Sequence, residues 1–178
     1  MTDDPTERIG DVEAARPIRM ILSDVDGVMT TGQLWFDASG SEIKQFHVRD
    51  GMAIKLWQAS GMAFGIVSSR NSPAVTRRAA ELGIQHVLQG VEPKLPAVVE
   101  VLRSLDIDRR AVAYIGDDLP DLPVMRHVGL SAAPADACSD VLARATWVLD
   151  TGGGHGAVRE LVERLMRAQS TWEAHAPA

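Results

Sequence analysis

The 178-residue sequence has little of what would direct a chain to a membrane, to a nucleic acid or to an oxidising compartment. Its one cysteine, Cys138, cannot form an internal disulfide and is typical of a small packed residue. The formal net charge is −6, whereas a duplex-binding protein normally shows a basic face. Because the chain also has neither a long apolar run nor a basic amphipathic segment, we expect no nucleic acid partner and no membrane partner.

The acidic N-terminal stretch has no apolar core of the kind that a secretory signal needs. We therefore expect a cytoplasmic protein. Residues 1–17 are predicted to be a flexible leader, residues 18–170 a single domain, and residues 171–178 a flexible tail. Hydrophobic residues make up 46% of the chain, which is enough to build one core of this size.

Short apolar runs alternate with longer amphipathic segments along the chain. Segments 33–36 and 42–48, separated by a turn, predict a hairpin. The pattern predicts an α/β fold: a Rossmann-like, doubly wound, mostly parallel sheet with a β-hairpin insertion after the first strand. Strands are predicted over 18–25, 63–69, 86–89, 111–117, 130–133 and 146–150, and helices over 50–61, 72–83, 92–105, 119–129, 134–145 and 156–170.

Capping residues set the limits of two predicted helices. Asp50 is expected to be the N-cap of the helix that Gly61 ends. Ser72 is expected to be the N-cap of the next helix, with Pro73 at its first position and Gly83 after its end.

Charged and hydroxyl side chains follow the predicted strands where those strands end. In an open α/β sheet the carboxyl ends of the strands form the edge at which ligands bind, so these side chains are expected to meet there. They are Asp24 and Asp26 after the first strand, Ser68, Ser69 and Arg70 after the second, Lys94 before a helix, and Asp117, Asp118 and Asp121 in "GDDLPD".

Several carboxylates at one edge would repel one another unless a cation lay between them. Mg²⁺ fits, because it takes a few carboxylate oxygens and keeps water and substrate phosphate as its other ligands. Asp24 and Asp117 are the expected carboxylate ligands, and Asp26 could reach the metal through its backbone carbonyl. Simpler interpretations remain: Asp118 and Asp121 as helix caps, and Arg49 and Arg70 as surface arginines.

Phosphate is the substrate group that suits this edge. Mg²⁺, Lys94, the Ser68 hydroxyl and backbone N–H groups would neutralise its charge in the transition state. One aspartate can attack phosphorus and form an aspartyl phosphate. The other, two residues along, can protonate the leaving oxygen and then activate water.

Four motifs in order resemble the phosphatase branch of the haloacid dehalogenase superfamily: "DVDGV", Ser68 after "FGIV", Lys94 and "GDDLPD". An aspartate two residues after the nucleophile is found in the phosphatases of that superfamily and not in its dehalogenases. The resemblance implies Mg²⁺ as cofactor and the following roles: Asp24 as nucleophile, Asp26 as acid and base, Ser68 and Lys94 as phosphate ligands, Asp117 as metal ligand, and Asp118 and Asp121 as supporting residues.

Longer stretches, including "FHVRDGMAIKLW" and "YIGDDLPDLPVM", are similar to the 3-deoxy-D-manno-octulosonate 8-phosphate phosphatases and their sialic-acid-type relatives. This likeness implies hydrolysis of a phosphorylated sugar acid in lipopolysaccharide sugar biosynthesis. Hydrolysis of a nine-carbon sialic-type 9-phosphate is the alternative, and a non-catalytic assembly or binding module is the third hypothesis. Arg49 and Arg70 match positions that face the substrate, so they are candidates for binding its carboxylate.

The segments between the motifs leave no room for a lid domain. Residues 26–51 accommodate a hairpin, and residues 70–94 accommodate one helix and one strand. The resemblance implies that such capless enzymes form homotetramers through their hairpins, here through Leu34, Trp35, Phe36 and Phe46. It also implies that the glycine-rich segment 151–156 can approach a neighbouring active site.

Overall fold

A computed structural model describes residues 10 and 12–175 of the chain. Its centre is a six-stranded sheet in the order β5-β4-β1-β6-β7-β8, in which every neighbouring pair is parallel. The strands are β1 (Met20–Ser23), β4 (Ala63–Val67), β5 (His86–Leu88), β6 (Val112–Ile115), β7 (Leu130–Ala133) and β8 (Trp147–Val148). All four residues of β1, β6 and β7 are buried, as expected for a parallel sheet covered on both faces.

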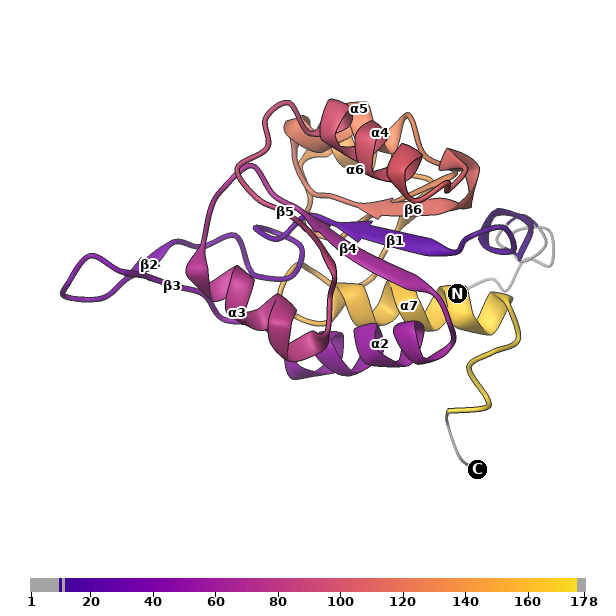
Figure 1. Cartoon of the computed structure of the whole chain (residues 1–178), viewed down its shortest axis with the longest axis horizontal. Helices are drawn as coiled ribbons and strands as arrows, with labels where there is room; N and C mark the ends of the chain where they lie inside the picture. The colour runs from indigo at the N-terminus through magenta and orange to yellow at the C-terminus, as the bar shows by residue number, and fades with distance from the viewer. Residues whose placement is uncertain (1–9, 11, 176–178) are drawn as a thin grey trace.

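Helices cover both faces of this sheet (Figure 1), which confirms the predicted α/β fold. On one face lie α2 (Val48–Ala59), α3 (Pro73–Leu82) and α7 (Ala157–Ala168), and on the other α4 (Lys94–Ser104), α5 (Leu122–Met125) and α6 (Ser139–Leu142). The first layer packs around Trp57 and Leu161, and the second around Val98 and Tyr114. Strand β1 lies at the centre, between β4 and β6, so its carboxyl end is the topological switch point of the sheet.

The predicted hairpin is present but shorter than expected. Strands β2 (Trp35–Phe36) and β3 (Glu42–Ile43) pair antiparallel and project from the body of the molecule (Figure 1). Asp37 closes the turn, because its Oδ1 accepts hydrogen bonds from the backbone N–H groups of Ser39 (2.8 Å) and Ser41 (2.9 Å). The second strand was predicted to run to residue 48, but it ends before Lys44, whose side chain is buried in an ion-pair cluster.

The sequence pattern predicts Asp50 as the N-cap of α2, and this prediction is wrong. The cap is His47, whose Nδ1 accepts a hydrogen bond from the Arg49 N–H. Asp50 lies buried inside the first turn, and its Oδ1 accepts a hydrogen bond from the Arg159 N–H at 2.8 Å. A contact with a distant helix therefore uses the side chain that appeared to be a local cap.

The caps predicted for α3 are confirmed in position. Ser72 is the N-cap residue, although its side chain makes no capping hydrogen bond, and Pro73 begins the helix. Gly83 ends it with φ of 70° in the left-handed region.

Two predicted helices are much shorter in the structure. The segment 134–145 contains only α6 of four residues, because residues 134–137 form a turn and the Cys138 N–H donates to the Asp117 carbonyl at 2.9 Å. The segment 119–129 begins as a 3₁₀ turn, Leu119–Asp121, before α5. In both places hydrogen bonds to residues 117 and 118, which follow β6, replace regular helical pairing.

Parts of the predicted leader and tail pack against the domain. Residues 12–15 form a helical turn in which Ala15 is buried. Trp172 is 4% exposed and lies under the Arg159 guanidinium at 4.5 Å. The boundaries at residues 17 and 170 stay predictions. Within residues 10 and 12–175, every helix is too short or too polar to cross a membrane.

Candidate active site

A pocket of about 310 Å³ opens at the carboxyl ends of β1, β4 and β6. All of the predicted site residues except Arg49 line it, and Arg49 is exposed on the first turn of α2. The lining residues are Asp24, Asp26, Gly32, Ser68, Ser69, Arg70, Lys94, Asp117, Asp118, Pro120 and Asp121.

Strand β1 fixes Asp24 at the floor of this pocket. The Asp24 N–H continues the pairing with β6 by donating to the Ile115 carbonyl at 3.0 Å. Its Oδ1 accepts a hydrogen bond from the Val25 N–H at 2.7 Å, and its Oδ2 lies 2.9 Å from Lys94 Nζ. A carboxylate held in this way has little rotational freedom, which suits a nucleophile.

Lys94 is the first residue of α4, and its side chain is almost completely buried. Its Nζ contacts Asp24 Oδ2 at 2.9 Å and Asp121 Oδ1 at 2.7 Å. Burial alone would lower the pKa of Lys94, but the charges of Asp24 and Asp121 more than offset this and raise it above its ordinary value. Lys94 therefore stays a cation beside Asp24.

Asp121 has every oxygen occupied by donors. Its Oδ1 accepts from the Tyr114 hydroxyl at 2.5 Å and from Lys94, and its Oδ2 accepts from the N–H groups of Asp117 (3.0 Å) and Asp118 (3.2 Å). It is therefore better suited to holding Lys94 and the "GDD" backbone than to binding a metal. Tyr114 belongs to none of the sequence motifs, and its pKa is raised well above its ordinary value by burial and by Asp121.

Asp118 takes a structural position next to this network. Its Oδ1 accepts a hydrogen bond from the Leu119 N–H at 2.8 Å and so caps the 3₁₀ turn. This matches the simpler interpretation, a cap, that the sequence left open for Asp118.

Carboxylate oxygens of Asp24, Asp117 and Asp121 lie within 4.8 Å of one another. Burial, with the charges of Asp121 and of Asp24 respectively, raises the pKa of Asp24 to about 6 and that of Asp117 to about 7. Asp117 Oδ1 is buried and has no hydrogen-bond partner. An orphaned oxygen beside a second carboxylate fits a hard divalent cation, and since Asp121 is saturated, Asp24 and Asp117 are the side chains suited to hold it.

Gly27 allows Asp117 to approach the loop after β1. Its φ is 88°, and a Cβ on it would lie 2.0 Å from Asp117 Oδ2. A side chain at position 27 would therefore both strain the backbone and displace Asp117.

Asp26 lies apart from this carboxylate cluster. Its Oδ1 forms an ion pair with Lys44 Nζ, and its Oδ2 lies 3.8 Å from Arg70 Nε. Arg70 also binds Glu42 Oε1 at 2.7 Å. The sequence motifs point to neither Lys44 nor Glu42, because Glu42 lies in β3 and Lys44 directly after it, away from the motifs.

Two serines that follow β4 form another wall of the pocket. Ser68 is buried, and its Oγ accepts a hydrogen bond from the Arg70 N–H at 3.2 Å. Ser69 Oγ is buried without a hydrogen-bond partner. Both hydroxyl groups retain a proton that they could donate to a phosphate oxygen.

The glycine-rich segment 151–156 packs on its own chain. The Gly154 N–H donates to the Val28 carbonyl at 2.9 Å, and a Cβ on Gly153 would lie 1.9 Å from the Gly27 carbonyl oxygen. The segment therefore packs against the loop after β1, which carries Asp26.

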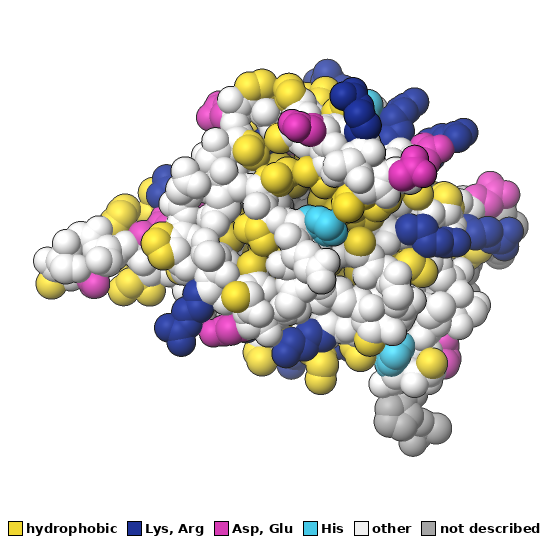
Figure 2. Space-filling model, viewed as in Figure 1, with side chains coloured by type: hydrophobic (Ala, Val, Ile, Leu, Met, Phe, Trp, Pro, Cys, Tyr) yellow, Lys and Arg dark blue, Asp and Glu magenta, His cyan; other side chains and the backbone are white. Residues whose placement is uncertain are grey.

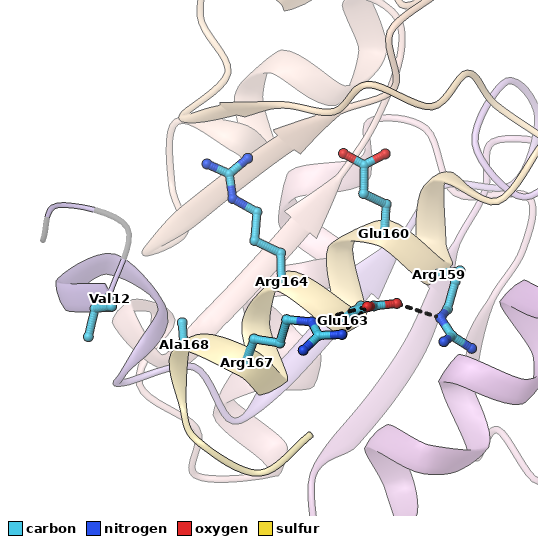
Figure 3. A pocket seen from close by; sticks show the side chains of 7 residues that line it. All are labelled: Val12, Arg159, Glu160, Glu163, Arg164, Arg167 and Ala168. Atoms are coloured by element: carbon cyan, nitrogen blue, oxygen red, sulfur yellow. Dashed lines mark hydrogen bonds and ion pairs between the residues drawn. The ribbon is translucent and has the colours of Figure 1, made fainter. Parts of the chain in front are cut away.

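A larger hollow of about 740 Å³ lies along α7 (Figure 3), and it shares no lining residue with the pocket at the strand ends. Its charged groups pair with one another: Glu163 accepts hydrogen bonds from both Arg159 and Arg167. Arg164 stacks over Trp147 at 4.2 Å. These paired charges make the hollow a weaker candidate for the active site than the smaller pocket.

The comparisons with known proteins agree with this geometry. The model of the haloacid dehalogenase-like hydrolase family matches residues 89–161. The chain is 43% identical over 162 residues to the 3-deoxy-D-manno-octulosonate 8-phosphate phosphatase of Yersinia pestis, covering 91% of this chain and 87% of that one. It is also 43% identical to the phosphatase of the same name from Escherichia coli K12, over 89% of this chain and 84% of that one.

Among solved structures, the phosphatase of the same name from Moraxella catarrhalis superposes with a TM-score of 0.92 at 37% identity, over 94% of this chain and 96% of that one. That structure is described as a complex with a magnesium ion, a phosphate ion and a KDO molecule. On its sequence, fold and pocket, the chain belongs to the 3-deoxy-D-manno-octulosonate 8-phosphate phosphatase family of the haloacid dehalogenase-like hydrolases.

Proposed function

We propose that this chain is a Mg²⁺-dependent phosphatase that hydrolyses 3-deoxy-D-manno-octulosonate 8-phosphate through an aspartyl phosphate. The observation that carries the proposal is the buried Asp24 at the switch point. Lys94 holds it, and it lies close to Asp117, whose Oδ1 has no hydrogen-bond partner. The names of the relatives, which cover most of both chains, support the choice of substrate.

Asp24 and Asp117 would hold the metal, with the Asp26 backbone carbonyl as a further ligand. Bound Mg²⁺ supplies positive charge next to the phosphoryl group and lowers the barrier to attack by an anion. Lys94 and the hydroxyl groups of Ser68 and Ser69 supply the protein's own donors to the phosphate oxygens.

The reaction has two steps that balance in protons. In the first, the Asp24 carboxylate attacks phosphorus, the bond from phosphorus to the sugar oxygen breaks, and the Asp26 carboxyl group gives its proton to that oxygen. In the second, Asp26 takes a proton from the water that attacks the aspartyl phosphate. Phosphate leaves, and both aspartates return to their starting states.

Arg70 is the stronger candidate for binding the substrate carboxylate. It lines the pocket, and its side chain is 46% exposed, so part of its guanidinium can meet a ligand. Arg49 was proposed for the same role, but it lies outside the residues that line this pocket.

We also propose that the chain assembles as a homotetramer through its hairpin. Leu34, Trp35, Phe36 and Ile43 are each at least half exposed, and hydrophobic side chains gather on the projecting hairpin (Figure 2). Phe46, which was also expected at the interface, instead packs against the core of its own domain.

A panel of phosphate esters assayed with Mg²⁺ tests the activity. The eight-carbon sugar acid phosphate should give the highest kcat/KM, above a nine-carbon sialic-type 9-phosphate and simple sugar phosphates. Asp24→Asn should lower phosphate release by about 10³-fold or more, since it removes the nucleophile. Chelation of the metal should abolish turnover, and added Mg²⁺ should restore it.

Asp140→Asn is the matched control, because Asp140 lies on α6, outside the pocket, and pairs with Arg144. It should leave kcat/KM unchanged. Unchanged release by Asp24→Asn would refute the mechanism. Tight binding of the sugar phosphate without turnover by the wild type would instead support a binding module.

A further inference from the structure

Four charged side chains form a closed ring beside the active-site pocket. Lys44 Nζ pairs with Asp26 Oδ1 and lies 3.4 Å from Glu42 Oε1. Arg70 completes the ring, because it binds Glu42 Oε1 at 2.7 Å and lies 3.8 Å from Asp26 Oδ2. Basic and acidic side chains alternate around the ring, so each acidic side chain contacts a basic one on both sides.

Lys44 is the most enclosed cation of this ring. Its side chain is 2% exposed, whereas that of Arg70 is 46% exposed. A buried ammonium group is costly unless carboxylates surround it, so Asp26 and Glu42 determine where Nζ lies. In turn, Nζ restricts the rotation of the Asp26 side chain.

The site therefore contains two buried lysines with separate partners. Lys94 contacts Asp24, the proposed nucleophile, and Lys44 contacts Asp26, the proposed acid and base. Lys94 lines the pocket, whereas Lys44 is not among the lining residues of that pocket. Lys44 thus reaches the reaction through Asp26 rather than through the phosphate.

We propose that Lys44 is a positioning residue, which orients the Asp26 carboxyl group for proton transfer to the leaving oxygen. The inference rests on the proposed function of Asp26 as acid and base. Glu42 assists, because it also contacts Lys44 Nζ. The hairpin therefore contributes to the chemistry as well as to the proposed interface between chains. General acid catalysis depends on geometry within hydrogen-bond reach, so a freely rotating Asp26 would transfer its proton poorly.

A series of substituted phenyl phosphates tests this role directly. Their leaving groups are alike in size and differ in basicity, and a basic leaving group needs a proton more than an acidic one. Because kcat/KM reports the steps up to departure of the leaving group, its dependence on leaving-group pKa measures proton transfer in that step. In wild type this dependence should be shallow.

Lys44→Met should make the dependence steep. We expect a loss of about 30-fold or more in kcat/KM for the most basic leaving groups and less than about 3-fold for p-nitrophenyl phosphate. Lys44→Arg should recover most of the loss, and Glu42→Gln should shift the dependence in the same direction by less. Lys55→Met, at an exposed lysine of α2, is the matched control and should follow wild type.

The outcomes separate this inference from the proposed function. If wild type releases phosphate from no ester, the phosphatase assignment itself fails. If wild type is active but Lys44→Met and Glu42→Gln lower kcat/KM equally across the series, or not at all, Lys44 has no positioning role. Unfolding midpoints of all variants show whether a uniform loss reflects loss of the folded state.

Discussion

At the scale of single residues, the site depends on how its charges are compensated. Asp121 has four donors and binds Lys94, whereas Asp117 keeps a buried oxygen with no hydrogen-bond partner. Two carboxylates in one "GDDLPD" segment therefore have different tasks, which their hydrogen bonds reveal and their residue type does not.

Gly27→Ala should damage the site far more than the fold. The new Cβ would overlap Asp117 Oδ2, and residue 27 would keep an unfavourable positive φ. We expect kcat/KM to fall by about 100-fold or more and the Mg²⁺ concentration for half-maximal activity to rise. Steady-state kinetics across a Mg²⁺ titration measure both effects.

Gly40→Ala is the control for backbone strain alone. Gly40 has φ of 83° in the hairpin turn, and no atom lies within 4 Å of a Cβ added there. This variant should lose about 1–2 kcal/mol of stability and keep its activity. Equal kinetics for the two variants would mean that the contact with Asp117 is unimportant.

At the scale of secondary-structure elements, helices α2 and α7 are joined by a buried carboxylate. Asp50 of α2 accepts a hydrogen bond from the N–H of Arg159, which lies in the first turn of α7. The start of α7 thus obtains its cap from another helix, because Gly156 has no side chain to supply one. This contact links the two most extensively packed helices of the layer.

Asp50→Asn should change how stability depends on pH. Burial raises the pKa of Asp50 to about 6 in the folded protein, from 3.8 in the unfolded chain. The folded state therefore binds more protons between these values, and wild type loses stability as pH rises through this window. The variant cannot lose a proton here, so its stability relative to wild type should rise by up to about 3 kcal/mol between pH 3 and pH 7.

Denaturant unfolding at several pH values measures this difference. Asp50→Ala is the companion variant, because it removes the cap altogether and should cost about 1–2 kcal/mol even at low pH. A difference between wild type and Asp50→Asn that stays constant over this pH range would show that Asp50 does not titrate with a raised pKa.

At the scale of the whole molecule, the hairpin projects from the domain and leaves large hydrophobic side chains exposed. It extends from the sheet, and its outer residues include Trp35 and Phe36, which are 58% and 59% exposed. Exposed aromatic side chains that gather on a projecting element are typical of an interface between chains.

Replacing both Trp35 and Phe36 with serine should therefore break the assembly without unfolding the domain. Sedimentation should give a tetramer for wild type and a smaller species for the variant at micromolar concentration. Val148→Ser is the control, because Val148 is 47% exposed on β8, away from the hairpin. A monomeric wild type, or a variant with unchanged mass, would contradict the proposed interface.

The sequence by itself determined the order of strands and helices and the composition of the pocket. Short buried runs such as residues 20–23 are local patterns, and the carboxyl ends of parallel strands must meet at one edge. The sequence alone therefore places Asp24, Ser68, Lys94 and Asp117 together.

Only the tertiary structure decided which partners the buried charged side chains have. Lys44 contacts Asp26, which lies 18 residues away along the chain, and Asp50 accepts a hydrogen bond from the backbone N–H of Arg159, which lies 109 residues away. Neither contact therefore has a local pattern in the sequence. The sequence pattern predicts Asp50 only as a helix cap and does not single out Lys44, because neither residue belongs to a motif. Burial makes both contacts necessary, because a buried charged group is costly unless a hydrogen bond or an opposite charge satisfies it.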